Sequence, residues 1–569
     1  MNEGQVRLLD ISKNEFARFR RGAKVDTITP LACSPFLAIF KSNLNAMNFK
    51  KMIAVGWSAV FLVCTGYAQV KPYTSSQIDS LVNKSMQLMP LAGIAVAVVK
   101  DGKVIHSKGY GVTSIKTKEA VDENTLFGIA SNSKAFTSMA LGILIDEGKL
   151  HWMDKVVDYL PEFKMYDPYI TAHFTIQDLL THRSGLGLGA GDLMFFPDGA
   201  DFTIQDVLKS FQYQKQTSEF RTRFDYDNLL YMVAGEVVTR VSGMPWTTFV
   251  ETRIMQPLGM ERSAGMYQNL KDKKNVALPH SAEPDLKLIG QYTEASASFA
   301  AAGGIYASVR DLSKWMLLHL NGGKFGDGLS RQLVSVENHN EMLRPHTMIG
   351  FNRKPNPALR AHLNAYGLGW GINDLNGYVI FSHTGGLPGL LSKTTLVPEL
   401  NLGVVVLTNT DPGGFAFETI SRMIVNAYFN SKNDLLTMAA GRVKERQSRG
   451  DSVTTAVWNT VQKASTTNLR LENFAGAYHD NWFGDVTIDL KGGELWFTSK
   501  RSPKLHGKMS YYKANTFAVR WDYRDMACDA FATFSMDEEG RATGIRMKGI
   551  SPNIDFSFDF QDLDLKRVK

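Results

Sequence analysis

Cysteine is scarce in this sequence: Cys33, Cys64 and Cys528 are the only three in 569 residues. The first two lie in a segment with the features of a cleaved leader, so Cys528 would remain alone and no intramolecular disulfide could form. We therefore expect Cys528 to be a buried apolar residue. An exported protein without disulfides fits a bacterial periplasm or cell surface better than a eukaryotic secretory lumen.

A long apolar run is also missing from the start of the chain. Residues 52–63 are apolar but fall short of the about 20 residues that span a bilayer. They follow the basic pair Lys50 and Lys51, and small residues precede the bond between Ala68 and Gln69. These features predict a cleaved secretory signal peptide, a periplasmic or secreted protein and no stable membrane span.

No basic stretch with interleaved aromatic residues remains beyond this leader. The formal net charge of +7 comes mostly from residues 1–68, where nine Lys or Arg stand against four acidic residues. The sequence therefore predicts no nucleic-acid partner. It also lacks His-x-x-x-His, paired cysteines and an Asp-rich ligand loop, so we expect no metal and no cofactor.

What is present indicates two folded domains after the leader and upstream extension of residues 1–68. Residues 69–430 begin with a predicted hairpin, 93–99 and 103–111, continue through a helix-rich middle and return to strands. The later strands are predicted at 367–372, 378–381, 390–397 and 402–407. Strands from both ends of the domain with helices between them predict an α+β fold with an antiparallel sheet.

The last part of the chain has a different pattern. Residues 431–467 are polar and predict a linker or a lone helix. Residues 468–569 alternate in short segments separated by turns, which predicts a small all-β barrel or sandwich. Its strands are predicted at 486–490, 494–498, 516–521, 530–534 and 555–560.

A serine and a lysine stand three residues apart where an apolar segment turns into a helix, at Ser131 and Lys134. Positions i and i+3 share one face of a helix, so the amine can lie beside the hydroxyl. Serine needs a neighbouring base, and a lysine with a lowered pKa can serve. The same spacing recurs at Ser510 and Lys513, but a strand pattern there directs the two side chains to opposite faces.

Two further motifs accompany this pair: Tyr226-Asp-Asn228 ahead of a helical run, and His383-Thr-Gly-Gly386 between strand patterns. With them, residues 75–430 resemble the serine β-lactamase and penicillin-binding-protein superfamily. The likeness is to its class C-like branch of D-aminopeptidases, D-Ala-D-Ala carboxypeptidases and esterases. Residues 468–569 resemble the lipocalin-like β-domain often appended to these hydrolases, which we expect to be a packing or oligomerisation module.

The resemblance implies a role for each motif residue. Ser131 would be the acylated nucleophile, Lys134 its base, and Tyr226 a second acid/base held by Asn228. The N–H groups of Ser131 and Gly386 would form the oxyanion hole. Thr384 and Gly385, of the same motif as Gly386, would support it. Nearby, His182 and Ser184 are expected to brace the fold.

Two positions depart from the family pattern. His383 replaces the usual lysine of the third motif, and at its ordinary pKa of about 6.5 it would be charged only in mildly acid solution. This weakens the expectation that a substrate carboxylate is bound. Asp227 replaces the commoner serine and is expected to raise the pKa of Tyr226.

The sequence thus predicts a serine hydrolase that forms an acyl-enzyme on amide or ester bonds. Its expected substrates are small peptides with D-residues, peptidoglycan fragments or β-lactams. The alternative is a non-catalytic protein of the penicillin-binding type, in which Ser131 is acylated slowly or not at all and the β-domain recognises a cell-wall or lipid ligand.

Overall fold

The computed structural model describes residues 72–283, 285–293, 297–354, 361–411, 413–429, 434–464 and 469–568. The predicted signal peptide and the residues before it lie outside these ranges. Within the ranges, no helix is both long and apolar enough to cross a bilayer.

An eight-stranded sheet forms the centre of the first domain, in the order β2-β1-β14-β13-β12-β11-β10-β9. The strands are β1 Gly93–Lys100, β2 Lys103–Gly111, β9 Thr347–Phe351, β10 Leu363–Tyr366, β11 Gly371–Leu375, β12 Tyr378–Leu387, β13 Leu390–Val397 and β14 Leu402–Thr408. β1, from the start of the domain, pairs antiparallel with β14, with Val96 opposite Val406. The expected α+β fold and the β1–β2 hairpin are therefore confirmed.

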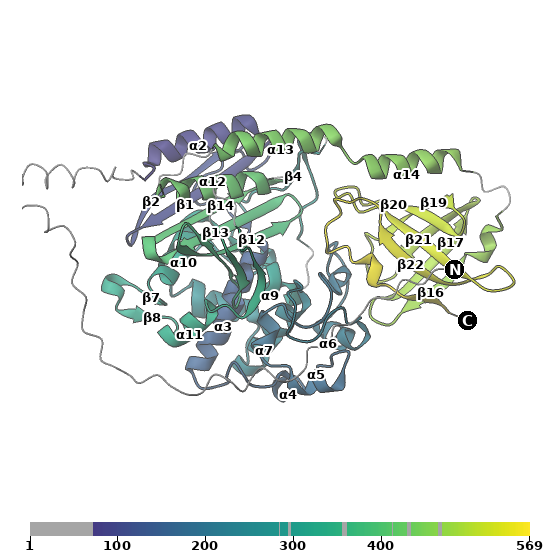
Figure 1. The fold of residues 1–569 in the computed structure, drawn as a ribbon, viewed down its shortest axis with the longest axis horizontal. Coiled ribbons are helices and arrows are strands. Elements are labelled where there is room, and N and C mark those ends of the chain that lie inside the picture. The colour runs from purple at the N-terminus through teal and green to yellow at the C-terminus, as the bar shows by residue number, and fades with distance from the viewer. Residues whose placement is uncertain are drawn as a thin grey trace, which may run out of the picture. The chain divides into compact units, whose positions relative to one another are not determined.

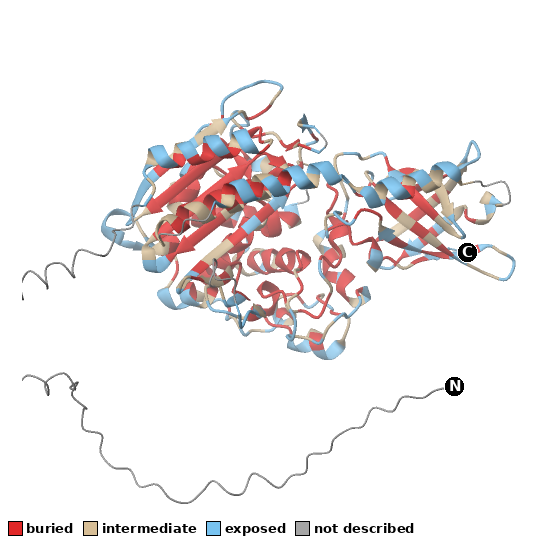
Figure 2. Ribbon diagram, turned by 45° about the horizontal axis from the view of Figure 1, so that its top comes forward, coloured by how far each residue is buried: buried red, intermediate tan, exposed pale blue. Residues whose placement is uncertain are grey.

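Helices cover both faces of this sheet, and alternate residues of β1 pack into the two hydrophobic cores on either side. Ile94, Val96 and Val98 pack with α2 (Ser75–Leu88), α12 (Gly414–Ala427) and α13 (Leu435–Arg449). Ala95, Ala97 and Val99 belong to the core on the other face, which includes α3 (Ser133–Asp146) and α10 (Val309–Leu320). Figure 1 shows these two helical layers, and Figure 2 shows the buried strands between them. Successive side chains of a strand point to opposite faces of its sheet, so β1 contributes to both cores.

The helix-rich middle also forms as predicted. It contains α4 Val156–Tyr159, α5 Pro168–His173, α6 Ile204–Ser210, α7 Leu229–Ser242, α8 Trp246–Val250 and α9 Ala300–Gly303. Thr203 caps α6 through a reciprocal capping box with Asp206. α7 begins directly after Asn228 and ends at Gly243, whose φ is 74°. The Tyr226-Asp-Asn228 motif is thereby fixed at a helix N-terminus.

The strand predicted at residues 367–372 is wrong over most of its length. Residues 367–370 connect β10 to β11, and Gly369 has a φ of 81°. A Cβ on Gly369 would lie 2.9 Å from the Cα of Ala135, so this turn packs directly against the start of α3. The glycines mark a close approach of backbones rather than a strand.

The second domain is a closed barrel, which confirms the expected all-β barrel. Its strands are β16 Gly476–Asp480, β17 Gly484–Lys491, β18 Glu494–Ser499, β19 His506–Lys513, β20 Thr516–Trp521, β21 Ala530–Met536, β22 Ala542–Gly549 and β23 Leu565–Arg567. Ser510 and Lys513 lie on β19, as predicted. Cys528 is a buried free thiol, also as predicted.

The strand predicted at residues 555–560 is wrong. These residues belong to the loop between β22 and β23. Phe558 and Phe560 are buried there, while Phe556 is 40% exposed. Phe558 packs against Phe196 of the first domain, with ring centroids 5.1 Å apart. Phe560 stacks on Trp521 of the barrel, with ring centroids 5.6 Å apart. The alternation of aromatic residues therefore arises from a loop that packs against both domains and not from a sheet.

Two helices, rather than an open linker, connect the domains. Leu436 and Val443 of α13 belong to the core of the first domain. Val457 of α14 (Ser452–Lys463) packs with Ala518 and Ile550 of the barrel. The two domains and these helices belong to one unit, Val70–Lys569.

Candidate active site

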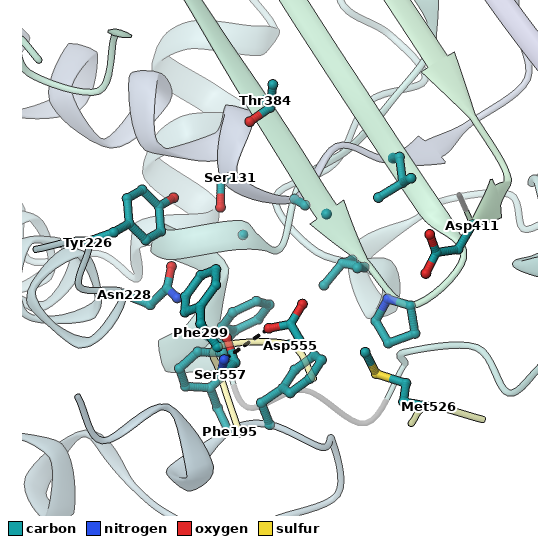
Figure 3. Close-up of a pocket in the computed structure, with 18 of the residues that line it drawn as sticks. Ser131, Phe195, Tyr226, Asn228, Phe299, Thr384, Asp411, Met526, Asp555 and Ser557 are labelled. Carbon is teal, nitrogen blue, oxygen red and sulfur yellow. Dashed lines mark hydrogen bonds between the residues drawn. The ribbon is translucent and has the colours of Figure 1, made fainter. Parts of the chain in front are cut away.

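Ser131 lies in a short 3-10 turn, Ala130–Asn132, directly before α3. The preceding Ala130 has a φ of 48°, a left-handed conformation that costs a residue with a Cβ about 1–3 kcal/mol. β12 passes close to this turn, since a Cβ on Gly385 would lie 2.1 Å from the carbonyl oxygen of Ile129. Gly385 is therefore required for the approach of β12. Ser131 faces a cavity of ≈ 330 Å³ (Figure 3).

Lys134 lies beside Ser131, as its spacing predicts. Its fully buried Nζ is 3.1 Å from Ser131 Oγ, 2.6 Å from Asn228 Oδ1 and 2.9 Å from the carbonyl oxygen of Ala302. Burial lowers the pKa of Lys134 to about 7, while Asp192 and Asp227 act in the opposite direction. In the neutral amine, two N–H groups can donate to Asn228 and Ala302. The lone pair is then left for the proton of Ser131.

Tyr226 directs its hydroxyl toward Ser131 (Figure 3). Burial raises its pKa well above the usual range, while a hydrogen bond with Ser131 acts in the opposite direction. The phenol is therefore protonated near neutral pH and suited to donate a proton. We expected Asp227 to raise this pKa, but burial is the main cause. Asp227 is itself fully buried, with a pKa raised to about 7.

Asn228 holds Lys134 rather than Tyr226, which differs from the role that the resemblance implied. Its Oδ1 accepts from Lys134 Nζ, and its Nδ2 donates to Asp192 Oδ2 at 2.8 Å. The Asn228 amide thus links Lys134 to Asp192.

His383 is buried on β12 and is neutral. Its Nδ1 lies 2.6 Å from the backbone oxygen of Thr384, so Nδ1 carries the hydrogen. Its Nε2, 2.8 Å from the hydroxyl of Tyr366, then accepts a hydrogen bond. Burial lowers the pKa of His383 to about 3, helped by the charge of Lys134. The expectation of a cation in mildly acid solution is therefore wrong.

Thr384 and Gly386 are the exposed residues of this strand segment, and both line the cavity with Ser131. The structure thus brings the third motif beside Ser131. Assignment of the Ser131 and Gly386 N–H groups to an oxyanion hole stays a prediction.

His182 braces Tyr226 from behind. Its ring centroid lies 4.2 Å from that of Tyr226 and 4.7 Å from that of Tyr366. Its Nδ1 accepts the backbone N–H of Asp227 at 3.1 Å. Since burial lowers the pKa of His182 well below its usual range, the ring is neutral.

The barrel contributes to the cavity, which the sequence did not predict. Met526, Asp555, Phe556 and Ser557 line it together with residues of the first domain. The ring of Phe556 meets that of Tyr226 edge-on, with centroids 5.9 Å apart. The alternating aromatic residues of the β22–β23 loop were the signal in the sequence for this contact, but their period of two predicts a strand.

One end of the cavity is acidic. Asp411, on β15 (Thr410–Asp411), and Asp555 both face it (Figure 3). Burial raises the pKa of both carboxyl groups, and Arg446 partly offsets this for Asp411. Among the described residues that line the cavity there is no lysine or arginine. The cavity therefore suits a neutral or cationic group better than a carboxylate.

Curated relatives share moderate similarity with this chain. Unguisins hydrolase ungD of Aspergillus violaceofuscus is 27% identical over 353 residues, which are 58% of this chain and 60% of that protein. Protein flp of Staphylococcus aureus strain COL is 27% identical over 338 residues, 59% of this chain and 63% of that protein. The chain thus spans about three-fifths of the length of the relatives it matches.

Solved structures share the fold at low identity. The octameric penicillin-binding protein homologue from Pyrococcus abyssi has a TM-score of 0.54 and 19% identity, covering 86% of this chain and 99% of that chain. A structure of SurE with D-Leu has a TM-score of 0.50 and 16% identity, covering 87% and 99%.

Family models match both domains. A domain of unknown function (DUF3471) matches residues 461–567. The model described as Beta-lactamase matches residues 78–429, which is more than half of the sequence. The chain therefore belongs to the Beta-lactamase family.

Proposed function

We propose that this protein is an exported serine hydrolase that forms an acyl-enzyme on amide or ester bonds of small peptides or peptidoglycan fragments. The observation that carries the proposal is the placement of Lys134 Nζ, 3.1 Å from Ser131 Oγ and with a pKa lowered to about 7. A buried lysine that is neutral near pH 7 is a competent base for a serine.

The reaction follows from the contacts around Ser131. Oγ attacks the substrate carbonyl carbon while its proton passes to Lys134 Nζ, and the carbonyl electron pair moves onto oxygen. That oxyanion would be stabilised by the N–H groups of Ser131 and Gly386. When the intermediate collapses, Tyr226 gives its proton to the leaving group and recovers one from Lys134. Water then releases the acyl group by the same steps in reverse.

The acidic end of the cavity bears on the substrate. Burial raises the pKa of Asp411 and Asp555, but a bound ammonium group would favour their ionised forms, whereas a C-terminal carboxylate would be repelled by any charge on them. Neutral His383 offers a carboxylate no charge. We therefore favour substrates with an amine over penicillins and other carboxylate-bearing compounds. D-residues in the substrate remain an inference from the resemblance.

The alternative of a non-catalytic binding protein has less support. Ser131, Lys134 and Asn228 form an unbroken set of contacts, which a binding protein would not need. Export is proposed from the leader alone. Peptide mapping of the mature protein should find Gln69 as the first residue, and a mature form that keeps residues 52–63 would indicate an anchor instead.

Intact mass spectrometry with matched acyl probes tests the proposal. Probes that share one leaving group and differ in carrying an amine, no charge or a carboxylate would be incubated with the full chain. We expect the mass of one acyl group to be added, fastest for the amine probe. A faster carboxylate probe would contradict the substrate class. Absence of acylation and of turnover with every probe would favour the binding protein.

A further inference from the structure

The loop between β22 and β23 is anchored in the first domain by Asp559. The buried carboxyl group accepts hydrogen bonds from the N–H of Gly191 at 2.8 Å and of Leu193 at 2.9 Å. Two bonds from one short turn fix both the position and the orientation of the carboxyl group. The anchor therefore brings the loop to the residue between these two donors, Asp192.

A chain of buried hydrogen bonds runs from this loop to the nucleophile. Ser557 Oγ donates to Asp192 Oδ2 at 2.8 Å, and the same oxygen accepts from Asn228 Nδ2 at 2.8 Å. Asn228 Oδ1 accepts from Lys134 Nζ at 2.6 Å, and Nζ lies 3.1 Å from Ser131 Oγ. Ser131, Asn228 and Ser557 lie along one side of the cavity (Figure 3).

We propose that Ser557, supplied by the barrel, is a positioning residue for Lys134 that acts through Asp192 and Asn228. This inference rests on the proposed function, because it assigns Lys134 the role of base. It also gives the barrel a part in catalysis in place of the packing role expected from the sequence.

The first reason that Lys134 depends on Ser557 is the orientation of the Asn228 amide. The amide can hold Lys134 only with Oδ1 toward Nζ, and this requires an acceptor for Nδ2, which Asp192 provides. Asp192 Oδ1 has no hydrogen-bond partner among the described residues. Without the Ser557 hydroxyl, the carboxyl group of Asp192 would be held by Asn228 alone and could turn.

The second reason that Lys134 depends on Ser557 is the charge of Asp192. Burial raises the pKa of Asp192 well above its usual range and Asp559 raises it further, whereas hydrogen bonds from Asn228 and Ser557 lower it. An ionised Asp192 raises the pKa of Lys134. Loss of the Ser557 hydroxyl therefore favours neutral Asp192 and lowers the pKa of Lys134.

Most other ionisable groups around these residues do not titrate near neutral pH. The side chains that stay neutral because of lowered or raised pKa values are His182, His383, Tyr226, Tyr231 and Tyr292. Asp227, with a pKa raised to about 7, also faces Lys134 and titrates in this range. It is unchanged in every variant of the test. The pKa of Asp555, which lines the cavity, is raised by burial and lowered by the Ser557 hydroxyl. The comparison is therefore repeated in an Asp555→Asn background, where a shift that persists reports on Asp192.

The test compares Ser557→Ala and Ser557→Thr in the full chain, with kcat and KM for a neutral activated ester measured from pH 5 to 9. For Ser557→Ala we expect kcat to fall about tenfold, because a slightly displaced base acts poorly in the transition state. KM should stay within about twofold, and the acid limb of the profile should move to lower pH. Ser557→Thr keeps the hydroxyl and should restore kcat and the limb.

Two further variants complete the design. Ser510→Ala, on β19, removes a serine of the barrel away from this hydrogen-bond chain and should match the wild type. Asp192→Asn keeps an oxygen for the hydrogen bonds from Asn228 and Ser557 but removes the charge, so it should move the acid limb to lower pH. If circular dichroism shows that Ser557→Ala has not folded, the shift in Asp192→Asn decides the question.

Several results would overturn the inference. They are an unchanged kcat and acid limb in Ser557→Ala, a Ser557→Thr variant as impaired as Ser557→Ala, and no shift of the acid limb in a folded Asp192→Asn variant. In each, the wild type remains active, so the proposed function stands. A wild type that neither hydrolyses the ester nor is acylated overturns the proposed function and this inference with it.

Discussion

The Nζ of Lys134 lies 3.1 Å from the Oγ of Ser131, within a single helical turn. The spacing of nucleophile and base is thus set by local backbone geometry. What the rest of the protein supplies is burial, which lowers the pKa of Lys134 to about 7, and the acceptors that orient its amine.

Removal of the nucleophile should abolish activity. Ser131→Ala is expected to lower hydrolysis of an activated ester by about four orders of magnitude or more, because nucleophile and base act as a unit. It should also prevent labelling by a fluorophosphonate. Ser510→Ala, which alters the serine of the second Ser-x-x-Lys on β19, should change neither. Labelling that survives Ser131→Ala would show that another residue is acylated.

The pH dependence of ester hydrolysis should follow the protonation state of Lys134. A base must be neutral to accept a proton, so kcat/KM for a neutral ester should fall about tenfold per pH unit below pH 7 and level off above it. Profiles from pH 5 to 9 measure this. Lys513→Met, on the barrel, serves as the matched control and should keep the same profile. A rate that is flat between pH 5.5 and 8 would mean that Lys134 is not the base.

A lysine at position 383 should restore carboxylate preference. Because burial keeps His383 neutral above about pH 3, the wild type should show no carboxylate-selective loss as pH rises from 5.5 to 8.5. His383→Lys should raise kcat/KM for a penicillin relative to a neutral ester by about tenfold, the effect of one charge-assisted hydrogen bond. His383→Gln adds no charge and should give no such gain. If the ratio of kcat/KM for the penicillin to that for the neutral ester is equal in the wild type and both variants, the substrate carboxylate does not bind beside position 383.

The barrel loop should limit the size of the acyl group. Phe556 lies in the cavity against Tyr226, so Phe556→Ala should raise kcat/KM for bulky acyl esters about tenfold relative to acetyl esters. Phe351→Ala removes an exposed phenylalanine ring on the edge strand β9 and should leave the ratio unchanged. If bulky and small esters respond alike to Phe556→Ala, the loop does not set the size limit.

Local signals were sufficient for part of this site. Ser131 and Lys134 needed only a helix start and a spacing of three, and their contact was predictable from helix geometry. Tyr226 and His383 came from the resemblance, since no spacing rule brings a residue after 220 and another after 380 to one serine. Their ionisation could not be foreseen, because the sequence does not show that Tyr366 would bond His383 in a buried site.

The barrel loop was missed for a physical reason. Phe556, Phe558 and Phe560 alternate as strand residues do, and a period of two does not distinguish a sheet from a loop that packs between two domains. The fold class of each domain was predictable because many residues share each pattern. The contact between the domains depends on a few side chains, such as Asp559 and Ser557, that carry no periodic signal.

The position of this loop in the chain has a consequence for biosynthesis. The ribosome makes Ser131 early and the loop at residues 551–559 late, and domains generally fold in the order of synthesis. The first domain can thus acquire its sheet and helices while one wall of its cavity is still missing. Under the proposed function, full activity would be gained only when the barrel docks, and a protease that removes the barrel would lower activity without altering Ser131.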